Sequence, residues 1–230
     1  MQRRTAIAVV IVLAALAVIL STMLLVTRPW ESAGAAPASE TGTPTDASAA
    51  AAPPALINDT THILDDAGAD APVVVEFLDF ECEACGQVFP TMEALREQYA
   101  GEVTFAIRYF PLPGHYNSGN AAVAVEAAAQ QGQFEAMYQR MFAPQAEWGE
   151  GQTSEASRFR GFAEELGLDM AAYDAAIADP ATLQRVEDDF QAGMALGVSS
   201  TPGIFIDGQP LELTRLSDIE TAIQSALDGE

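Results

Sequence analysis

Hydrophobic residues form one long uncharged run near the N-terminus and shorter, periodic runs from about residue 60 onward. The long run, residues 5–27, is rich in Ala, Val, Ile and Leu and contains no charged side chain. At about 1.5 Å per residue, a helix of this length crosses a hydrocarbon core of roughly 30 Å. Arg3 and Arg4 precede the run, so the positive-inside rule places residues 1–4 in the cytoplasm and everything after Trp30 outside. We therefore predict a single transmembrane anchor at residues 5–27.

A cleaved signal peptide is the alternative to an uncleaved anchor. Ala33-Gly34-Ala35 could serve as the cleavage site. However, the apolar run is longer than the roughly 7–15 residues that form the core of a signal peptide, and Arg28 lies between the run and that site. We favour the uncleaved anchor, which keeps the rest of the chain at the membrane.

Residues 28–58 show no hydrophobic periodicity. They consist mostly of Ala, Pro, Ser, Thr and Gly, a composition that cannot bury a core. We predict a disordered tether that lets the following domain range over the membrane surface, and a stalk that crosses a cell wall is the alternative. The folded domain is expected at residues 59–230.

The first part of that domain alternates between strand and helix patterns. Residues 62–64 are typical of a short first strand, and residues 73–80 form an apolar, β-branched run that predicts a buried strand. Helical sequence follows at residues 87–99, and a second apolar strand is expected at residues 103–110. Strand, helix and strand in this order predict two parallel strands joined by a right-handed crossover.

Helical patterns fill residues 117–197. Residues 120–131 are rich in Ala, while Phe134, Met137, Tyr138 and Met141 recur at helical spacing, which is typical of core positions. The expected helix caps and stops are Thr153 or Ser154, Asp169, Asp179 followed by Pro180, and finally Gly197.

Strand patterns return after this helical block. Residues 203–206 are apolar, Asp207-Gly208 is a strong signal for a tight turn, and residues 211–213 are expected to pair back as a hairpin. Ser217 and Glu220 have the spacing of a capping box, which predicts a C-terminal helix that ends near residue 227.

The charge of the chain excludes some classes of partner. Its 33 acidic residues outnumber ten basic ones, all of them arginine, for a formal charge of −23. Such a surface repels nucleic acid and anionic lipid headgroups, so we expect no nucleic-acid partner.

The only cysteines in the chain, Cys82 and Cys85, have the spacing Cys-x-x-Cys directly after the strand at residues 73–80 and before a helix. The free N–H groups and dipole of a helix N-terminus stabilise a thiolate, which favours redox chemistry with Cys82 as the nucleophile. A purely structural bridge would close too small a loop to contribute more than about 2 kcal/mol. A zinc site would need further ligands, and only His62 and His115 could supply imidazole nitrogens.

Further residues at fixed distances carry a resemblance to a known family. Glu76 lies six residues before Cys82, Pro90 lies five residues after Cys85, and Thr201-Pro202 precedes a later strand. With the Cys-x-x-Cys, this pattern resembles thioredoxin-fold proteins, and most closely the DsbA-type thiol:disulfide oxidoreductases, over about residues 60–228. The resemblance implies an α/β thioredoxin fold with an inserted helical domain at about residues 117–197, preceded here by the transmembrane helix.

The resemblance also assigns roles to residues. Cys82 would attack and Cys85 would resolve the mixed disulfide, while a cis peptide bond before Pro202 would let Thr201 bind an extended substrate peptide as an added strand. A buried carboxyl such as Glu76 has a raised pKa, and the resemblance suggests that it exchanges a proton with Cys85. The alternatives are a strand carboxylate that faces solvent and a proline that merely begins a strand.

One departure from the family pattern leaves the direction of electron flow open. The dipeptide between the cysteines is Glu83-Ala84, where strongly oxidising members of the family carry Pro-His. Glu81 and Glu83 place negative charge beside Cys82, which opposes its thiolate and makes a disulfide less oxidising. His115, in a loop rich in Pro and Gly, is expected to pack or to line the substrate groove.

These observations together predict an extracytoplasmic, membrane-anchored thiol:disulfide oxidoreductase without metal or cofactor. Its expected substrates are exported, reduced polypeptides, and the resemblance implies reoxidation by a quinone-linked membrane partner. The alternatives are a reductase of the same fold, such as one that serves cytochrome maturation, and a non-catalytic peptide-binding or chaperone module.

Overall fold

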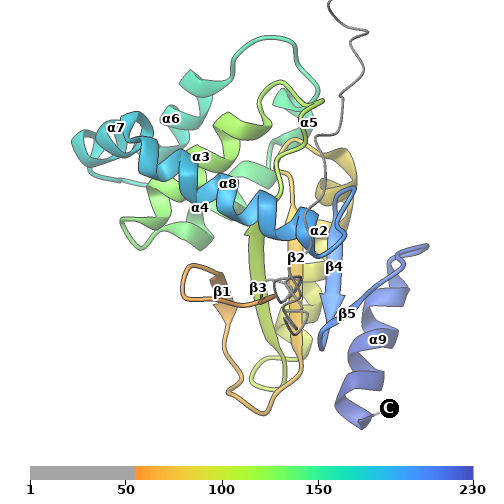
Figure 1. The fold of residues 1–230 in the computed structure, drawn as a ribbon. Coiled ribbons are helices and arrows are strands. Elements are labelled where there is room, and N and C mark those ends of the chain that lie inside the picture. The colour runs from red at the N-terminus through yellow and green to blue at the C-terminus, as the bar shows by residue number, and fades with distance from the viewer. Residues whose placement is uncertain (1–54, 230) are drawn as a thin grey trace, which may run out of the picture. The chain divides into compact units, whose positions relative to one another are not determined.

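A computed structural model describes residues 55–229 (Figure 1). The predicted anchor and nearly all of the predicted linker lie outside the described residues. The strands are β1 (His62–Asp65), β2 (Val73–Leu78), β3 (Thr104–Tyr109), β4 (Gly203–Ile206) and β5 (Gln209–Pro210). The helices are α2 (Glu83–Gln98), α3 (Ser118–Ala129), α4 (Phe134–Phe142), α5 (Gln145–Trp148), α6 (Ala156–Glu165), α7 (Met170–Ala178), α8 (Pro180–Ala195) and α9 (Ser217–Asp228).

The strands form one mixed sheet in the order β1-β3-β2-β4-β5. β2 and β3 are parallel, as the strand–helix–strand pattern predicts, with Glu76 opposite Ile107. β1 pairs antiparallel with β3, and β4 pairs antiparallel with β2, with Glu76 opposite Ile204. β2 therefore lies between two strands, and all of its residues from Val74 onward are buried.

The two faces of the sheet are covered by different helices. Side chains alternate between the faces of a strand, so Val74 faces the same side as Glu76 and Leu78, and Val75 faces the side of Phe77. Val74 belongs to the core cluster that contains residues of α2 and α9, whereas Val75 packs in a cluster that receives Phe190 of α8. In Figure 1, α8 crosses one face of the strands while α2 lies behind them.

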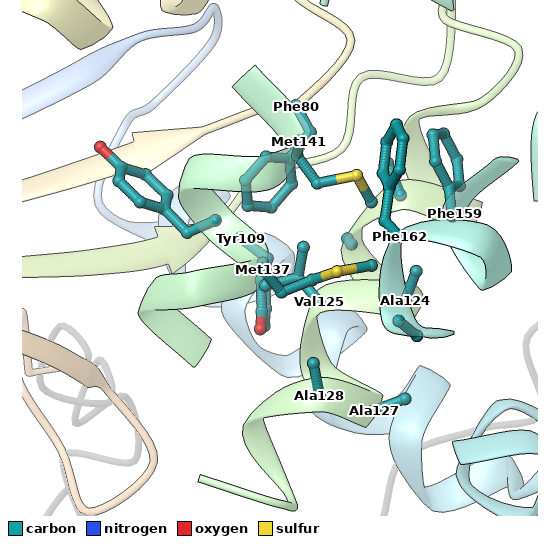
Figure 2. Close-up of a cluster of buried hydrophobic side chains, with 14 of the residues drawn as sticks. Phe80, Tyr109, Ala124, Val125, Ala127, Ala128, Met137, Met141, Phe159 and Phe162 are labelled. Carbon is teal, nitrogen blue, oxygen red and sulfur yellow. The ribbon is translucent and has the colours of Figure 1, made fainter. Parts of the chain in front are cut away.

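The helices α3 to α8 occupy the chain between β3 and β4 and build most of a second core. Figure 2 shows the side chains of Met137 and Met141 from α4 and of Phe159 and Phe162 from α6 gathered around α3. The Ala-rich sequence of α3 lets the neighbouring helices pack closely on it. The Met and Phe side chains are thus core residues, as predicted.

Several of the predicted helix ends and turns are confirmed. Asp169 caps α7 by accepting the N–H groups of Ala171 and Ala172, and Asp179 caps α8 by accepting that of Ala181. Gly197, with φ of 88°, follows the end of α8, and the β4–β5 turn is left-handed at both Asp207 and Gly208.

The predicted cap of α6 is confirmed only in part. Glu155, rather than Thr153 or Ser154, is the N-cap residue and its side chain makes no capping hydrogen bond, but Ser154 Oγ accepts the Ala156 N–H at 3.4 Å. Asn117 Oδ1 accepts the Glu155 N–H at 2.8 Å, and Asn117 Nδ2 donates to the Thr153 carbonyl at 3.0 Å. A side chain from the start of α3 therefore fixes this loop.

Two predictions near the C-terminus also fail. The partner strand of β4 is Gln209–Pro210 rather than residues 211–213, because Asp207 and Gly208 form a two-residue loop that places the pairing earlier. Of the predicted residues, Leu211 still donates its N–H to the Ile204 carbonyl at 2.8 Å. Ser217 is not an N-cap: it is the first residue of α9, and Asp218 Oδ2 accepts the N–H groups of Thr214 and Arg215 at 3.0 and 2.9 Å.

Candidate active site

The cysteine pair lies at the connection between β2 and α2. The strand ends at Leu78, and a turn closes when the Cys82 N–H donates to the Asp79 carbonyl at 3.1 Å. Cys82 is the N-cap residue of α2, and its carbonyl accepts the Gly86 N–H at 3.1 Å. Both thiols are free; Cys82 is 8% exposed and Cys85, one turn further in, is fully buried. Cys82 therefore lies at the edge of the core with a little surface open to another molecule, whereas Cys85 has none.

The two thiols have opposite shifts in pKa. The pKa of Cys82 is lowered to about 5: a hydrogen bond from Cys85 lowers it most, partial burial works against it, and Thr201 and the N–H groups of Cys85 and Ala84 lower it further. Burial raises the pKa of Cys85 well above its ordinary value, and the charges of Glu76 and Cys82 add to the effect. At neutral pH the pair thus holds one thiolate, on the sulfur that is accessible.

Glu76 is buried in β2, so it is not a solvent-facing strand carboxylate. Only 2% of the residue is exposed. Burial raises its pKa to about 8, and the charges of Cys82 and Glu93 raise it further. Because Glu76 and Cys85 influence each other's titration, a carboxyl that is mostly neutral at pH 7 lies within electrostatic reach of the buried thiol.

The loop at Thr201 and Pro202 lies next to Cys82, although it is far from it in the sequence. The Thr201–Pro202 peptide bond is cis, and the Thr201 carbonyl lies 3.5 Å from Cys82 Sγ, at a distance at which the thiol can donate to it. The pairing of β4 with β2 brings this loop to the motif, since Glu76 is opposite Ile204. The Thr201 side chain is buried beside Cys82 and contributes to the lowered pKa of that thiol.

The two glutamates beside Cys82 differ in their surroundings. Glu83 is exposed in the first turn of α2. Glu81 is fully buried, and its Oε2 accepts the Asn117 N–H at 2.5 Å at the N-terminus of α3, where the helix dipole favours a negative charge. We expected the negative charges of Glu81 and Glu83 to raise the pKa of Cys82. The pKa is nevertheless lowered, because the hydrogen bonds to the Cys82 sulfur stabilise its thiolate.

Two contributors to the site were not found by sequence reasoning. Gln145 of α5 donates from Nε2 to the carbonyls of Phe80 and Cys82, both at 2.8 Å, and so holds the start of α2 from the helical block. The buried Asp79 accepts the Glu81 N–H at 2.9 Å through Oδ1. An acid that directly follows an apolar strand was the signal for Asp79; Gln145 left no signal in the sequence.

Asp79 also fixes the loop that carries His115. Its Oδ2 accepts the Leu112 N–H at 3.0 Å and lies 2.7 Å from His115 Nδ1. His115 is partly exposed, and its closest side-chain contact is this one with Asp79. Its place in a substrate groove stays a prediction. In residues 55–229 no group of three or more His, Cys, Asp or Glu side chains is arranged to hold a metal ion. None of the helices described there is long and apolar enough to cross a bilayer.

Comparison with known sequences supports one family. A family model described as Thioredoxin matches residues 60–225. The Na(+)/H(+) antiporter NhaA of Herminiimonas arsenicoxydans is 33% identical over 153 residues, which are 66% of this chain and 23% of the antiporter. An NhaA 3 antiporter of Salinispora tropica is 37% identical over 142 residues, 61% of this chain and 21% of the antiporter. The chain thus spans less than a quarter of the length of these curated relatives.

Solved structures share the fold. A thioredoxin-like oxidoreductase from Silicibacter pomeroyi superposes with a TM-score of 0.63 at 23% identity, covering 74% of this chain and 94% of that one. The α-DsbA1 protein of Wolbachia pipientis gives 0.64 at 20% identity with coverages of 75% and 94%. Oxidised BdbD from Bacillus subtilis gives 0.63 at 18% identity with coverages of 74% and 94%.

Proposed function

The chain belongs to the thioredoxin family, and from that premise we propose that it is a thiol:disulfide oxidoreductase that forms or exchanges disulfides in exported proteins. The observation that carries the proposal is the asymmetry of the cysteine pair. Cys82 is accessible with a pKa of about 5, while Cys85 is buried with a raised pKa. Disulfide exchange requires such a pair, in which one sulfur reacts with the substrate and the other resolves the intermediate.

In the oxidising direction, the reaction starts from a Cys82–Cys85 disulfide. A substrate thiolate attacks Cys82 Sγ, the bond between the cysteines breaks, and the electron pair moves to Cys85. Because the pKa of Cys85 is raised, its sulfur takes up a proton, and Glu76 is the neutral acid that can supply it. A second substrate thiolate then attacks the substrate sulfur of the mixed disulfide and releases Cys82 as a stable thiolate, so that the substrate is oxidised and the cysteine pair reduced.

The lowered pKa of Cys82 favours a disulfide that is more oxidising than that of thioredoxin. The attacking cysteine has a pKa of about 7 in thioredoxin and about 3.5 in DsbA, and the corresponding potentials are about −270 and −120 mV. At about 5, Cys82 lies between these cases. A stabilised thiolate stabilises the reduced protein and makes its disulfide more oxidising. The reductase remains the second candidate because Glu83-Ala84 lacks the Pro-His of strong oxidants.

Substrate binding would use the loop at Thr201 and Pro202. An extended reduced polypeptide would add a strand beside this cis-proline loop, with its cysteine at Cys82. A non-catalytic peptide-binding module would need no carboxyl of raised pKa under its cysteines. The buried Glu76 therefore supports an enzyme.

The proposed location is the outer face of a membrane. Residues 1–4 would lie in the cytoplasm, residues 5–27 would span the bilayer, and residues 28–58 would tether the catalytic domain outside. The uncharged run and the preceding arginines support this topology. Reoxidation would fall to a quinone-linked membrane partner, and the acidic surface argues against nucleic acid.

The proposal is tested with the full-length chain in detergent. The oxidised protein should convert a reduced two-cysteine peptide to its disulfide in stoichiometric amount, and Cys82→Ser should abolish the reaction. A redox titration against glutathione then decides between an oxidase and a reductase, since an oxidase has a reduction potential well above that of thioredoxin. Reduction of insulin at a thioredoxin-like potential would favour the reductase, and no exchange in either assay would exclude the proposed function.

A further inference from the structure

The cysteine motif lacks a cation of its own. The dipeptide Glu83-Ala84 is acidic, and Glu81 adds a second carboxylate next to Cys82. The chain has no lysine, and each arginine in residues 55–229 forms an ion pair with a carboxylate: residues 96, 108, 140, 158, 160, 185 and 215. Positive charge for the thiolate must therefore come from a histidine or from backbone dipoles.

His115 is the histidine held next to the motif. Its Nδ1 lies 2.7 Å from Oδ2 of Asp79, a carboxyl with no solvent exposure. Asp79 in turn closes the turn to Cys82, because its carbonyl accepts the Cys82 N–H and its Oδ1 accepts the Glu81 N–H. One buried carboxylate thus fixes both the loop that carries His115 and the turn that carries the nucleophile.

The charge state of His115 follows from the groups that face it. Partial burial lowers its pKa, but the hydrogen bond and charge of Asp79 and the charges of Cys82 and Glu81 outweigh burial, so its pKa is raised. Coupling between two titrating groups is reciprocal. Because the charge of Cys82 raises the pKa of His115, an imidazolium at His115 favours the Cys82 thiolate by the same free energy, which is smaller than the effects of Cys85 and Thr201.

We propose that His115, fixed by Asp79, supplies to the Cys82 thiolate the positive charge that the Glu83-Ala84 dipeptide lacks. This deepens the proposed function and rests on it. The cation enters from the loop after β3 rather than from between the cysteines, and it also neutralises the Asp79 carboxylate beside the turn. Removing the imidazole would take a cation away from the Cys82 thiolate and would leave the Asp79 charge without its counterion. Both effects destabilise the thiolate and so raise the pKa of Cys82.

His115→Asn is the informative variant, because an asparagine amide can still donate to Asp79 but carries no charge. The matched control is His62→Asn. His62 pairs with Glu126 at 2.9 Å and stacks on Phe134, in another part of the domain. Thermal unfolding of both reduced variants checks that they are folded.

The test compares full-length wild type and both variants in the reduced state. Thiolate absorbance near 240 nm is followed over pH, and the equilibrium with glutathione is measured separately. For His115→Asn we expect the titration midpoint of Cys82 to rise by about 0.5–1 and the equilibrium constant for oxidising glutathione to fall about three- to tenfold, or about 15–30 mV. His62→Asn should change neither.

A His115→Asn protein whose midpoint and equilibrium constant stay within twofold of wild type would overturn the proposal, as would an equal change in His62→Asn. The absorbance titration needs no exchange reaction. Failure of the wild type to exchange with glutathione would contradict the proposed function. The absorbance titration would still show whether His115 changes the pKa of Cys82.

Discussion

Replacing Glu76 by Gln should stabilise the reduced protein in a manner that depends on pH. The carboxyl is 2% exposed, and burial followed by the charges of Cys82 and Glu93 raises its pKa from 4.5 to about 8. An acid with a raised pKa in the folded state binds its proton more tightly there than in the unfolded chain. Its ionisation therefore removes stability as the pH rises from about 4.5 to about 8, and nothing more is lost above that range.

The magnitude follows from the same two values. At 1.36 kcal/mol per pKa unit, a rise from 4.5 to about 8 corresponds to on the order of 5 kcal/mol between the ends of the range, and about 3 kcal/mol is lost by pH 7. Glutamine has the shape of the neutral acid and cannot ionise. Glu76→Gln should thus match wild type within about 1 kcal/mol at pH 4.5 and exceed its stability by several kcal/mol at pH 9.

Urea unfolding of the reduced proteins, followed by circular dichroism at intervals from pH 4.5 to 9, measures this difference. Groups that are not coupled to Glu76 titrate equally in both proteins and cancel, whereas Cys82 and Cys85 are coupled to it. The oxidised proteins, in which neither thiol titrates, are therefore measured as well. The control is Glu97→Gln on the exposed face of α2, which removes a carboxylate from the same helix without touching the buried site. In the oxidised protein the Cys82 thiolate is absent, so the Glu76 transition should move to lower pH. A flat difference for Glu76→Gln would refute the proposal that this buried carboxyl holds a proton near neutrality.

Three further outcomes are expected. Glu83→His removes an exposed anion beside Cys82, so the reduction potential of the Cys82–Cys85 pair, measured against glutathione, should rise by on the order of tens of millivolts. An unchanged or lower potential would show that local charge does not set it. Gly193→Ala would place a Cβ 2.6 Å from the Phe110 ring, so its free energy of unfolding in urea should fall by about 1–3 kcal/mol. In Gly161→Ala nothing lies within 4 Å of the new Cβ, so the free energy of unfolding should rise by up to about 1 kcal/mol. Equal effects of the two substitutions would contradict the packing. Protease added to spheroplasts should digest everything beyond residue 30 and leave a membrane-bound stub, whereas a released protein that begins near Ala36 would show a cleaved signal peptide.

Local patterns were sufficient to predict much of the fold. The β-branched run of β2, the helical spacing of Met137 and Met141, and the caps at Asp169 and Asp179 each depend on neighbours in the sequence. The same holds for Cys82 at the start of a helix. The thioredoxin fold with a helical insertion was implied by the family resemblance, with which the order of these elements agrees.

Contacts between distant segments could not be predicted in this way. Glu81 looked like a free anion beside Cys82, but it caps α3 through the Asn117 N–H, 36 residues away. Gln145 reaches the Cys82 carbonyl across 63 residues. Local competition misled as well, since Asp218 rather than Ser217 binds the N–H groups before α9. The first two contacts join segments far apart in the sequence, and the third is a choice between neighbouring acceptors; only the folded structure shows which contacts form.

Trapping of substrates through a single cysteine tests the central claim most directly. Full-length Cys85→Ser lacks the resolving thiol, so Cys82 should remain joined to exported polypeptides as mixed disulfides that reducing agent releases. Cys82→Ser should trap none, because Cys85 is fully buried and its pKa is raised. Mass spectrometry of the trapped species should find every linkage at Cys82. Linkage of substrate to Cys85 in the Cys82→Ser protein, or no trapping by Cys85→Ser, would contradict the assignment of the two thiols.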